Sequence, residues 1–327
     1  MILCRTPFRV SFFGGGTDFP QWYLENGGAV ISTSINKYSY ITVRTLPDIF
    51  NYRYRLRYFK TEEVKNINEI KHPTFREALK KHFLKNKTIE IVHNADLPAM
   101  TGLGSSSSTA VGTIHALSFF NKKKLNKLDL ALDAIDIEQN ILKENVGSQD
   151  QIAASFGGFN YIQFNRNRIK VNKILNIKNV EKIEKSILLV FSGTQRKANN
   201  IERDKIRNLK KNYNYLNLMN QLTLEARSIL LSNKFTIEEF GKLLDHQWEI
   251  KKKLSSMVSN PKINDIYELG IQNGAYGAKL LGAGHGGFIV FICNENVKNR
   301  IKEKLKNFFN ISIKFENSGS KIIYKDN

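Results

Sequence analysis

The chain has 327 residues, of which 41% are hydrophobic and 24% are charged, so it is too apolar for a disordered protein. This length suits one large domain or two smaller ones. Lys and Arg number 50 against 30 Asp and Glu, and the formal charge of +20 suits nucleic acid, an anionic membrane or small polyanionic substrates. The lysines are spread through the sequence among Asn and Ile, however. Lysines on solvent-exposed surfaces therefore explain the excess of positive charge as well as an electrostatic field that attracts a ligand does.

The two cysteines, Cys4 and Cys293, lie far apart in apolar surroundings, which excludes a disulfide framework and a cysteine-rich metal site. Arginines and a proline interrupt the apolar stretch at the start of the chain, so it lacks the core of a secretory signal. The sequence has no run of 18 apolar residues, as a transmembrane helix requires. We therefore expect a cytoplasmic protein with no membrane partner.

Polar and apolar residues alternate in the first half of the chain in the way that predicts strands. Three strands come first, and a short helix, a further strand and a loop rich in glycine and serine follow. A helix begins directly after this loop, and a longer amphipathic helix and a hairpin come later. The predicted strands are residues 4–13, 29–46, 52–59, 88–95, 158–165 and 167–174, and the predicted helices are residues 77–85, 105–121 and 127–144.

A change in composition near residues 176–185 marks the end of the first half. The second half begins with a strand and continues with a charged helical region to about Ser232, further helices, a glycine-rich segment, a Lys-rich helix and a last short strand. We therefore expect an α+β protein, with one domain of residues 1–175 and another of residues 186–327.

Three glycine-rich segments adjoin apolar strands or helices, unlike solvated linkers. They read FFGGGTDF at 12–19, MTGLGSSSST at 100–109 and LLGAGHGGF at 280–288. None is a P-loop, because the Gly-Lys pair of the chain continues into leucine rather than Ser or Thr. The third satisfies G-x-G-x-x-G, but its strand follows the glycines instead of preceding them, so we reject a dinucleotide site there.

The second segment has the composition of an anion site. Gly102 and Gly104 allow close approach to the backbone, and a helix that begins near Ser105 presents unpaired N–H groups and the positive end of its dipole. The serines can cap this helix, and one hydroxyl can also bind Mg²⁺. Plain capping without any ligand is the alternative.

Glu138 falls on the apolar side of the predicted helix at 127–144. Its spacing from Ala131, Ile135 and Leu142 places the carboxylate on their stripe. A buried carboxylate needs a cation or several donors, and Mg²⁺ bound to ATP meets that need, because this ion takes one or two carboxylates together with phosphate oxygens. A glutamate that reaches water from the edge of the stripe is the alternative.

Asp150 comes 12 positions after Glu138, in a predicted loop just past the glycine that should end the helix. One of two carboxylates can hold a metal while the other takes a proton from a hydroxyl, but an aspartate in a loop also forms simple turns. Arg9 and Asp18 flank the first glycine run. Arg9 can point from its strand into a cleft, although an arginine ordinarily lies on the surface. The ordinary interpretation of Asp18 is an aspartate that closes a turn.

Together these segments resemble the GHMP kinases, the family of galactokinase, homoserine kinase, mevalonate kinase and phosphomevalonate kinase. RTPFRVSFFGGGTD resembles the first motif of the family, PAMTGLGSSSS its phosphate loop, and KLLGAGHGGF its third, glycine-rich motif. All three occur in the order of the family, and they cover both ends and the middle of the chain. The resemblance implies a ribosomal protein S5 domain 2-like amino-terminal domain and a ferredoxin-like carboxy-terminal domain, with ATP and substrate between them.

The resemblance also implies roles for individual residues. Ser106 and Glu138 would hold Mg²⁺, Asp150 would be the catalytic base, and Arg9 matches the basic residue that polarises the acceptor hydroxyl. Some members of the family have no such aspartate, so its role is less general than ATP binding. The implied ATP-binding residues are Gly102, Leu103, Gly104, Ser105, Ser106, Ser107 and Ser108. The implied substrate-binding residues are Arg9, Gly15, Gly16, Thr17, Asp18, Asp150, Gly284, Gly286, Arg196 and Lys197.

Within the family, GGGTD departs from the G-E-x-x-D pattern of galactokinase, which argues against galactose. FFGGGTD, GGAVISTSINKY and GSQDQIAASFGG look most like the D-glycero-D-manno-heptose 7-phosphate kinases, which phosphorylate the anomeric hydroxyl to give the 1,7-bisphosphate for GDP-heptose and surface polysaccharide synthesis. Such a substrate already carries a phosphate. Arg196 and Lys197, or residues near Asn36 and Lys37, are the cations that we expect to bind it.

Two alternatives stay open. One is a GHMP kinase for another acceptor, such as L-fucose, mannose or a different phosphosugar. The other is an RNA-binding protein, since an S5-like fold and a basic charge permit it, although glycine loops and interior carboxylates have no use in binding a phosphate backbone. We expect ATP and a phosphorylated sugar as partners and no nucleic acid, and we leave the oligomeric state open between a monomer and a homodimer.

Overall fold

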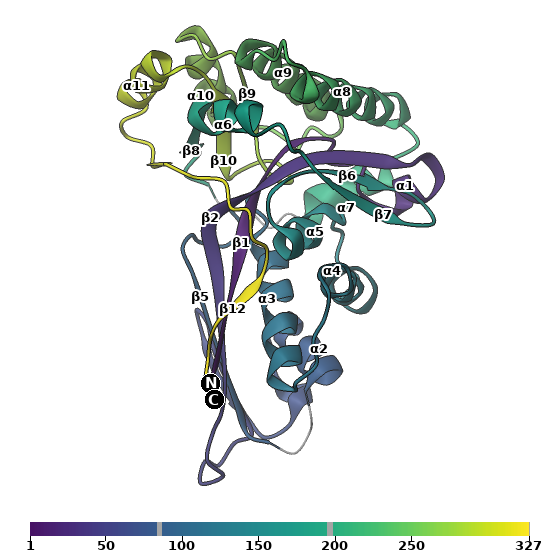
Figure 1. Cartoon of the computed structure of the whole chain (residues 1–327), viewed down its shortest axis with the longest axis vertical. Coiled ribbons are helices and arrows are strands. Elements are labelled where there is room, and N and C mark those ends of the chain that lie inside the picture. Colours follow the sequence, from purple (N-terminus) through teal and green to yellow (C-terminus); the bar gives the residue numbers. More distant parts are fainter. Residues whose placement is uncertain (84–86, 195–198, 327) are drawn as a thin grey trace.

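Two sheets organise the computed structural model, which describes residues 1–83, 87–194 and 199–326 (Figure 1). The larger sheet has eight strands in the order β12-β1-β2-β5-β3-β4, with β6 joined to β2 and β7 joined to β6. Only β3 and β5 pair in parallel among its described strands. The strands are β1 (Ile2–Phe13), β2 (Gly28–Thr45), β3 (Tyr54–Arg57), β4 (Thr61–Val64), β5 (Ile89–Ala95), β6 (Phe159–Phe164), β7 (Ile169–Lys173) and β12 (Lys321–Lys325).

Irregular pairing between β1 and β2 determines where Arg9 lies. The register shifts after Pro7, which has no N–H to donate, and again between Ser11 and Phe13. Irregularities of this kind bend a strand and change the direction of its side chains. Arg9 lies between the two shifts and is buried, so the alternative of a surface arginine is wrong.

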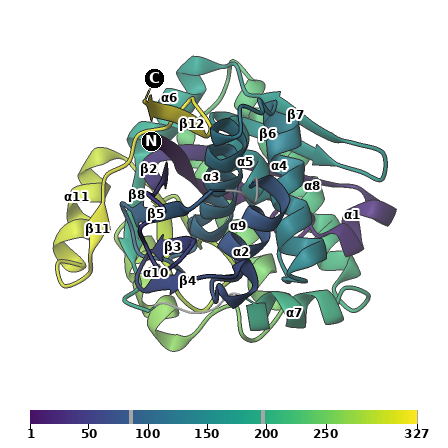
Figure 2. The same cartoon turned by 90° about the horizontal axis from the view of Figure 1, so that it is seen from below.

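The helices of the first half cover one face of this sheet. Helix α3 lies at their centre, between the sheet and helices α2, α4 and α5 (Figures 1 and 2). Its side chains are buried almost all round, as in a helix that is surrounded by other elements. These helices are α1 (Pro20–Asn26), α2 (Pro73–His82), α3 (Ser105–Phe120), α4 (Lys127–Ile135) and α5 (Gln149–Phe156), with a 3-10 turn at Ile67–Glu69 and a π-helical segment at Asp136–Ile141.

The second half forms a four-stranded antiparallel sheet in the order β11-β8-β10-β9, with helices packed against it. Together the halves give the α+β architecture that the GHMP kinase resemblance implies. The described helices include none that is long and apolar enough to cross a membrane. The elements are α6 (Ile177–Ser186), β8 (Ile187–Phe191), α7 (Asn199–Arg207), α8 (Tyr213–Leu231), α9 (Ile237–Lys253), α10 (Pro261–Gln272), β9 (Gly277–Leu280), β10 (Phe288–Ile292), α11 (Glu295–Lys304) and β11 (Asn310–Ile311).

The two halves are joined by more than the connecting chain. Strand β12 returns to pair with β1, so residues 321–325 lie in the first sheet although the sequence groups them with the second half. Phe12 of β1 stacks on Phe159 and meets Phe240 of α9 edge to face, within one buried cluster that draws on both halves. Residues from both halves are therefore held at fixed positions where they meet.

Two local predictions are wrong. The helix predicted to continue to residue 144 ends as α4 at Ile135 and is followed by the π-helical segment. Asp150, which we expected in a loop, lies in the first turn of α5, where an acidic side chain interacts favourably with the helix dipole. The first error concerns the end of a helix and the second a short helix that was not expected, and both depend on contacts that the local pattern does not show.

Candidate active site

The phosphate loop enters α3 through two glycines in the left-handed region. Gly102 has a φ of 80° and Gly104, at the N-cap of α3, a φ of 74°. No side chain caps this helix end, which contradicts the simple capping interpretation of the serines. Ser107 donates to Glu138 and Ser108 to the carbonyl of Pro7 instead. The first N–H groups of an α-helix have no partner inside the helix, so this end retains the character of an anion site.

The second and third glycine segments meet backbone to backbone. A Cβ atom added at Gly282 would lie 2.6 Å from the Cα of Gly102, and one added at Gly102 would lie 2.6 Å from the carbonyl oxygen of Leu281. The N–H of Phe288 also donates to the carbonyl of Thr101 at 3.0 Å. The third segment therefore supports the phosphate loop directly, and only glycine fits at the contact.

Replacing Gly282 with Ala is expected to lower the free energy of unfolding by about 2 kcal/mol or more, since left-handed strain alone costs about 1–2 kcal/mol and the new methyl group also collides with Gly102. Denaturant unfolding measures the effect. Gly15→Ala is the control, because the nearest atom to a Cβ there is 3.5 Å away. Equal losses in both variants would show that the close contact does not determine stability.

Glu138 lies fully buried in the π-helical segment, a kind of helical irregularity that is frequent at functional sites. Its carboxylate accepts hydrogen bonds from Ser106 Oγ at 3.3 Å, Ser107 Oγ at 2.8 Å and Gln151 Nε2 at 2.5 Å. Burial, together with the charge of Glu144, raises the pKa of the Glu138 carboxyl to about 7. The edge-of-stripe alternative, with Glu138 in water, is therefore wrong. A carboxylate whose hydrogen-bond partners are all neutral lies beside the phosphate loop.

Arg9 and Asp150 form a bidentate ion pair next to the same loop. Arg9 Nε and Nη2 donate to Asp150 Oδ1 and Oδ2, each at 2.7 Å, and Nη1 donates to the carbonyl of Gly102 at 2.7 Å. Arg9 is buried, whereas the side chain of Asp150 keeps 23% of its surface exposed. A Cβ at Gly104 would lie only 3.3 Å from Asp150 Oδ2. The pair is thus in contact with the loop and open to a ligand on one side.

The first glycine segment forms a tight turn around Asp18. The carboxylate accepts N–H groups from Gly16 at 2.9 Å and from Gln149 at 3.2 Å. Burial raises the pKa of Asp18 to about 6, and the charge of Asp150 adds to the shift. Thr17 donates to the carbonyls of Gly14 and Ala29, so its hydroxyl fixes the turn. Gln149 is the residue before Asp150, which brings Asp18 close to the ion pair.

The other residues that the sequence predicts to bind the substrate lie in different parts of the chain. Gly284 and Gly286 lie in the third segment, where a Cβ atom would come within 2.7 Å of the carbonyls of Val258 and Thr194 respectively. Asn36 hydrogen bonds with the backbone of Lys314, in the segment that leads back to β12. Arg196 and Lys197 lie outside the described residues.

Sequence reasoning missed three buried lysines beside the third segment. Lys251 Nζ donates to the carbonyls of Leu280 and Gly282, Lys205 to that of Ala283, and Lys279 to those of Ser11 and Phe12. Two of them had a local signal. Lys279 interrupts an apolar strand, and Lys251 follows Leu244 and Gln247 at helical spacing on the buried side of α9.

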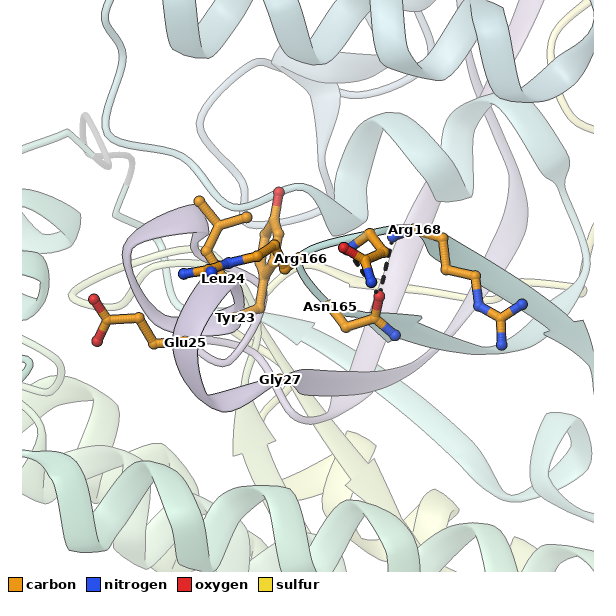
Figure 3. Close-up of a pocket in the computed structure, with 8 residues that line it drawn as sticks. Tyr23, Leu24, Glu25, Gly27, Asn165, Arg166 and Arg168 are labelled. Carbon is orange, nitrogen blue, oxygen red and sulfur yellow. Dashed lines mark hydrogen bonds between the residues drawn. The ribbon is translucent and has the colours of Figure 1, made fainter.

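A hollow of about 550 Å³ lies elsewhere, between α1 and the turn that joins β6 and β7 (Figure 3). Tyr23, Leu24 and Glu25 line it from α1, and Arg166 and Arg168 line it from the turn. It includes none of the site residues expected from the sequence. The convergence of the three glycine segments therefore identifies the candidate active site better than the size of this hollow does.

Comparison with known proteins identifies the family of the chain. Residues 69–158 match the family model of the GHMP kinases N terminal domain, and residues 229–311 match that of the GHMP kinases C terminal domain. A D-glycero-alpha-D-manno-heptose 7-phosphate kinase from Campylobacter jejuni is 31% identical over 317 residues, which are 93% of each chain. The bifunctional fucokinase/GDP-fucose pyrophosphorylase of Arabidopsis thaliana is 23% identical over 95% of this chain and 32% of that longer protein.

Solved structures share the fold. A D-glycero-D-manno-heptose 1-phosphate kinase from Bacteroides thetaiotaomicron has a TM-score of 0.81 at 23% identity, with full coverage of both chains. Lactococcus lactis galactokinase, in complex with galactose, has a TM-score of 0.74 at 18% identity over 98% of this chain and 94% of its own. With both family models matched and 31% identity across nearly the whole chain, the protein belongs to the GHMP kinases, phosphotransferases that transfer phosphate from ATP to a hydroxyl group.

Proposed function

We propose that this protein phosphorylates the anomeric hydroxyl of D-glycero-D-manno-heptose 7-phosphate with ATP and so supplies the 1,7-bisphosphate for GDP-heptose and surface polysaccharide synthesis. The proposal of phosphoryl transfer is supported by the contact between the phosphate loop and the Arg9–Asp150 pair. A hydroxyl bound at Asp150 would lie beside phosphates bound by that loop, as in-line transfer requires. The choice of sugar rests on the 31% identity to the Campylobacter jejuni heptose 7-phosphate kinase.

In the proposed reaction, Asp150 accepts the proton of the acceptor hydroxyl as the new O–P bond forms and the bond from the γ-phosphorus to ADP breaks. Arg9 holds both carboxylate oxygens in place and adds positive charge beside the reacting groups. The proton then passes from Asp150 to solvent, which the exposed part of this side chain permits. An anomeric hydroxyl is more acidic than an ordinary alcohol, so positioning and charge contribute more than the strength of the base.

The loop from Gly102 to Ser108 would bind the phosphates of ATP through backbone N–H groups and the end of α3. Ser106 and Glu138 would hold Mg²⁺, which neutralises phosphate charge when it is bound. The donors fit this ion, because a hydroxyl and one carboxylate leave room for phosphate oxygens and water. The described residues contain no group of three or more His, Cys, Asp or Glu side chains that could hold a metal by themselves, which agrees with a nucleotide-bound ion.

The acceptor would lie between the first and third glycine segments. Asp18 would accept sugar hydroxyls, with Gly15 and Gly16 at the turn that Thr17 fixes. Gly284 and Gly286 would close the other side. Because the glycine loops and buried carboxylates have a use in a kinase and none in RNA binding, they favour the kinase over the RNA-binding alternative.

A panel of acceptors with measured release of ADP tests the function. We expect the highest kcat/KM with D-glycero-D-manno-heptose 7-phosphate, and product analysis should show phosphate on the anomeric oxygen. The control is the same reaction without acceptor, which measures ATP hydrolysis by water. The relatives that are named as fucokinase and galactokinase supply the competing acceptors. Faster turnover with L-fucose, mannose or galactose would contradict the proposed acceptor.

A further inference from the structure

Lys205, Lys251 and Lys279 lie buried at the junction of the two halves, and the reaction proposed above does not use them. They come from α7, α9 and β9, and each has at most 5% of its surface exposed. Lysine is among the residues least often buried unless it is paired. Three together therefore require an explanation.

The lysines converge on one short stretch of backbone. Lys251 reaches the carbonyls of Leu280 at 3.1 Å and Gly282 at 2.6 Å, and Lys205 reaches that of Ala283 at 2.7 Å. Lys279 is part of the same stretch, next to Leu280. The ammonium of Lys279 points instead to the carbonyls of Ser11 and Phe12, and the positive charges of the three lysines act on one another, so the groups lie near one another.

Their positive charge is only partly balanced. Lys205 pairs with Glu202 at 3.2 Å, but among the described residues Lys251 and Lys279 have no carboxylate within ion-pair distance. Arg9 adds a further cation nearby, which Asp150 neutralises. Burial, together with the charges of Arg9 and Lys205, lowers the pKa of Lys279 to about 7, while the charge of Asp18 opposes the shift. Burial and the charges of Lys279 and Lys205 also lower the pKa of Lys251, against the opposing charge of Glu202.

Each ammonium also keeps a donor to offer. The lowered pKa values describe the site without an anion, and a bound anion favours the charged ammonium form, which has three N–H donors. Lys251 and Lys279 each use two on backbone carbonyls, and Lys205 uses one on a carbonyl and one on Glu202. Within the described part of the chain, one donor on each lysine therefore has no protein partner. A phosphate group, with several acceptor oxygens and two negative charges, matches this set.

The position of the cluster favours the acceptor over the nucleotide. Lys279 bonds to Ser11 and Phe12, which lead directly into the first glycine segment, and the other two lysines bond to the third. These are the segments between which the sugar is proposed to lie. No hydrogen bond or ion pair between described residues joins any of the lysines to Ser106 or Glu138.

We propose that Lys205, Lys251 and Lys279 bind the phosphate that the acceptor already carries, so that the enzyme selects phosphorylated sugars over free sugars. The identity of the acceptor rests on the function proposed above, whereas the presence of a phosphate site does not. Arg196 and Lys197, which the sequence suggested for this phosphate, lie outside the described residues.

Charge removal at Lys279 or Lys205 tests the proposal. Glutamine retains N–H donors for the backbone carbonyls but carries no charge. For Lys279→Gln and Lys205→Gln, we expect KM for heptose 7-phosphate to rise at least tenfold, while KM for ATP changes less than threefold. The value of kcat/KM should fall about tenfold more for heptose 7-phosphate than for the unphosphorylated heptose, so the preference for the phosphorylated sugar falls about tenfold.

Lys298→Gln is the matched control. Lys298 is also buried, donates to a carbonyl, that of Lys185, at 2.6 Å, and pairs with Glu295, but it lies on α11 outside the site. The Lys298→Gln variant should keep the wild-type preference for the phosphorylated sugar over the free sugar. A second measurement uses inorganic phosphate alone, which should raise the unfolding temperature of the wild type and of the Lys298 variant by more than that of the two site variants, where only the anion site at the start of α3 is left to bind it.

The outcomes separate the two proposals. The proposed phosphate site would be wrong if both site variants kept the wild-type preference for the phosphorylated sugar. It would also be wrong if KM for ATP rose as much as KM for the sugar phosphate. If the wild type phosphorylates no phosphosugar, the proposed function fails, and the titration with inorganic phosphate then decides the phosphate site by itself. Stabilisation by phosphate that is equal in all variants would refute it.

Discussion

Asp150→Asn is expected to lower kcat by about 100-fold to 10,000-fold, the usual contribution of a general base, while KM for ATP changes less than threefold. Asparagine has the same shape but cannot take the proton of the acceptor hydroxyl, and it leaves one side of the Arg9 guanidinium without a negative partner. Initial rates over a range of ATP and sugar phosphate concentrations measure both constants.

The control for this substitution is Asp265→Asn, an exposed aspartate on α10 that should leave both constants unchanged. Because Arg9 stays buried when its partner changes, thermal unfolding of each variant must show that the protein is folded at the assay temperature. A folded Asp150→Asn protein with normal turnover would remove Asp150 from the reaction. A rise in KM for ATP alone would assign the carboxylate to nucleotide binding.

Glu138→Gln is expected to raise the Mg²⁺ concentration for half-maximal activity by about tenfold or more, because the amide cannot replace a charged metal ligand. The carboxylate accepts hydrogen bonds from Ser106, Ser107 and Gln151 and forms no ion pair with a cation among the described residues, so its charge is free for a metal. Activity titrated with Mg²⁺ at saturating ATP measures the shift. Glu268→Gln, on the exposed side of α10, is the control.

The same substitution should change how stability depends on pH in metal-free buffer. The pKa of Glu138 is raised from 4.5 to about 7 by burial, so between these values the unfolded chain releases the proton while the folded protein retains it. The folded protein then binds more protons, and its stability falls as the pH rises from about 4.5 to 7. Glu138→Gln should lessen this fall and make the protein more stable than wild type at pH 8. An unchanged magnesium titration together with an unchanged pH profile would contradict both roles.

Much of the fold and the site could be predicted because their signals are local. Strands such as β1 and β5 alternate polar and apolar residues over short stretches, and glycines mark the backbone positions where no Cβ fits, as at Gly102 and Gly282. Helical spacing placed Glu138 on a buried face, which the structure confirms. The type of many of the elements and the family therefore followed from the sequence.

Other features depend on pairing between distant residues, which local patterns do not encode. Arg9 and Asp150 are 141 positions apart, and their ion pair exists because a bulged strand and the first turn of a helix meet. The pairing of β12 with β1 also joins distant parts of the sequence. An edge strand has free backbone groups that can pair with any strand lying beside it, so the local pattern does not specify its partner.

By itself the sequence determined the fold class, the family and the three glycine segments, because glycine content and hydrophobic periodicity act over a few residues. Only the tertiary structure decided which charges are buried and which face one another. The lysines of α7, α9 and β9 are ordinary members of a basic composition until the two halves pack and remove them from water. Backbone carbonyls meet part of the cost of burying these charges, and the phosphate that we propose would meet the rest.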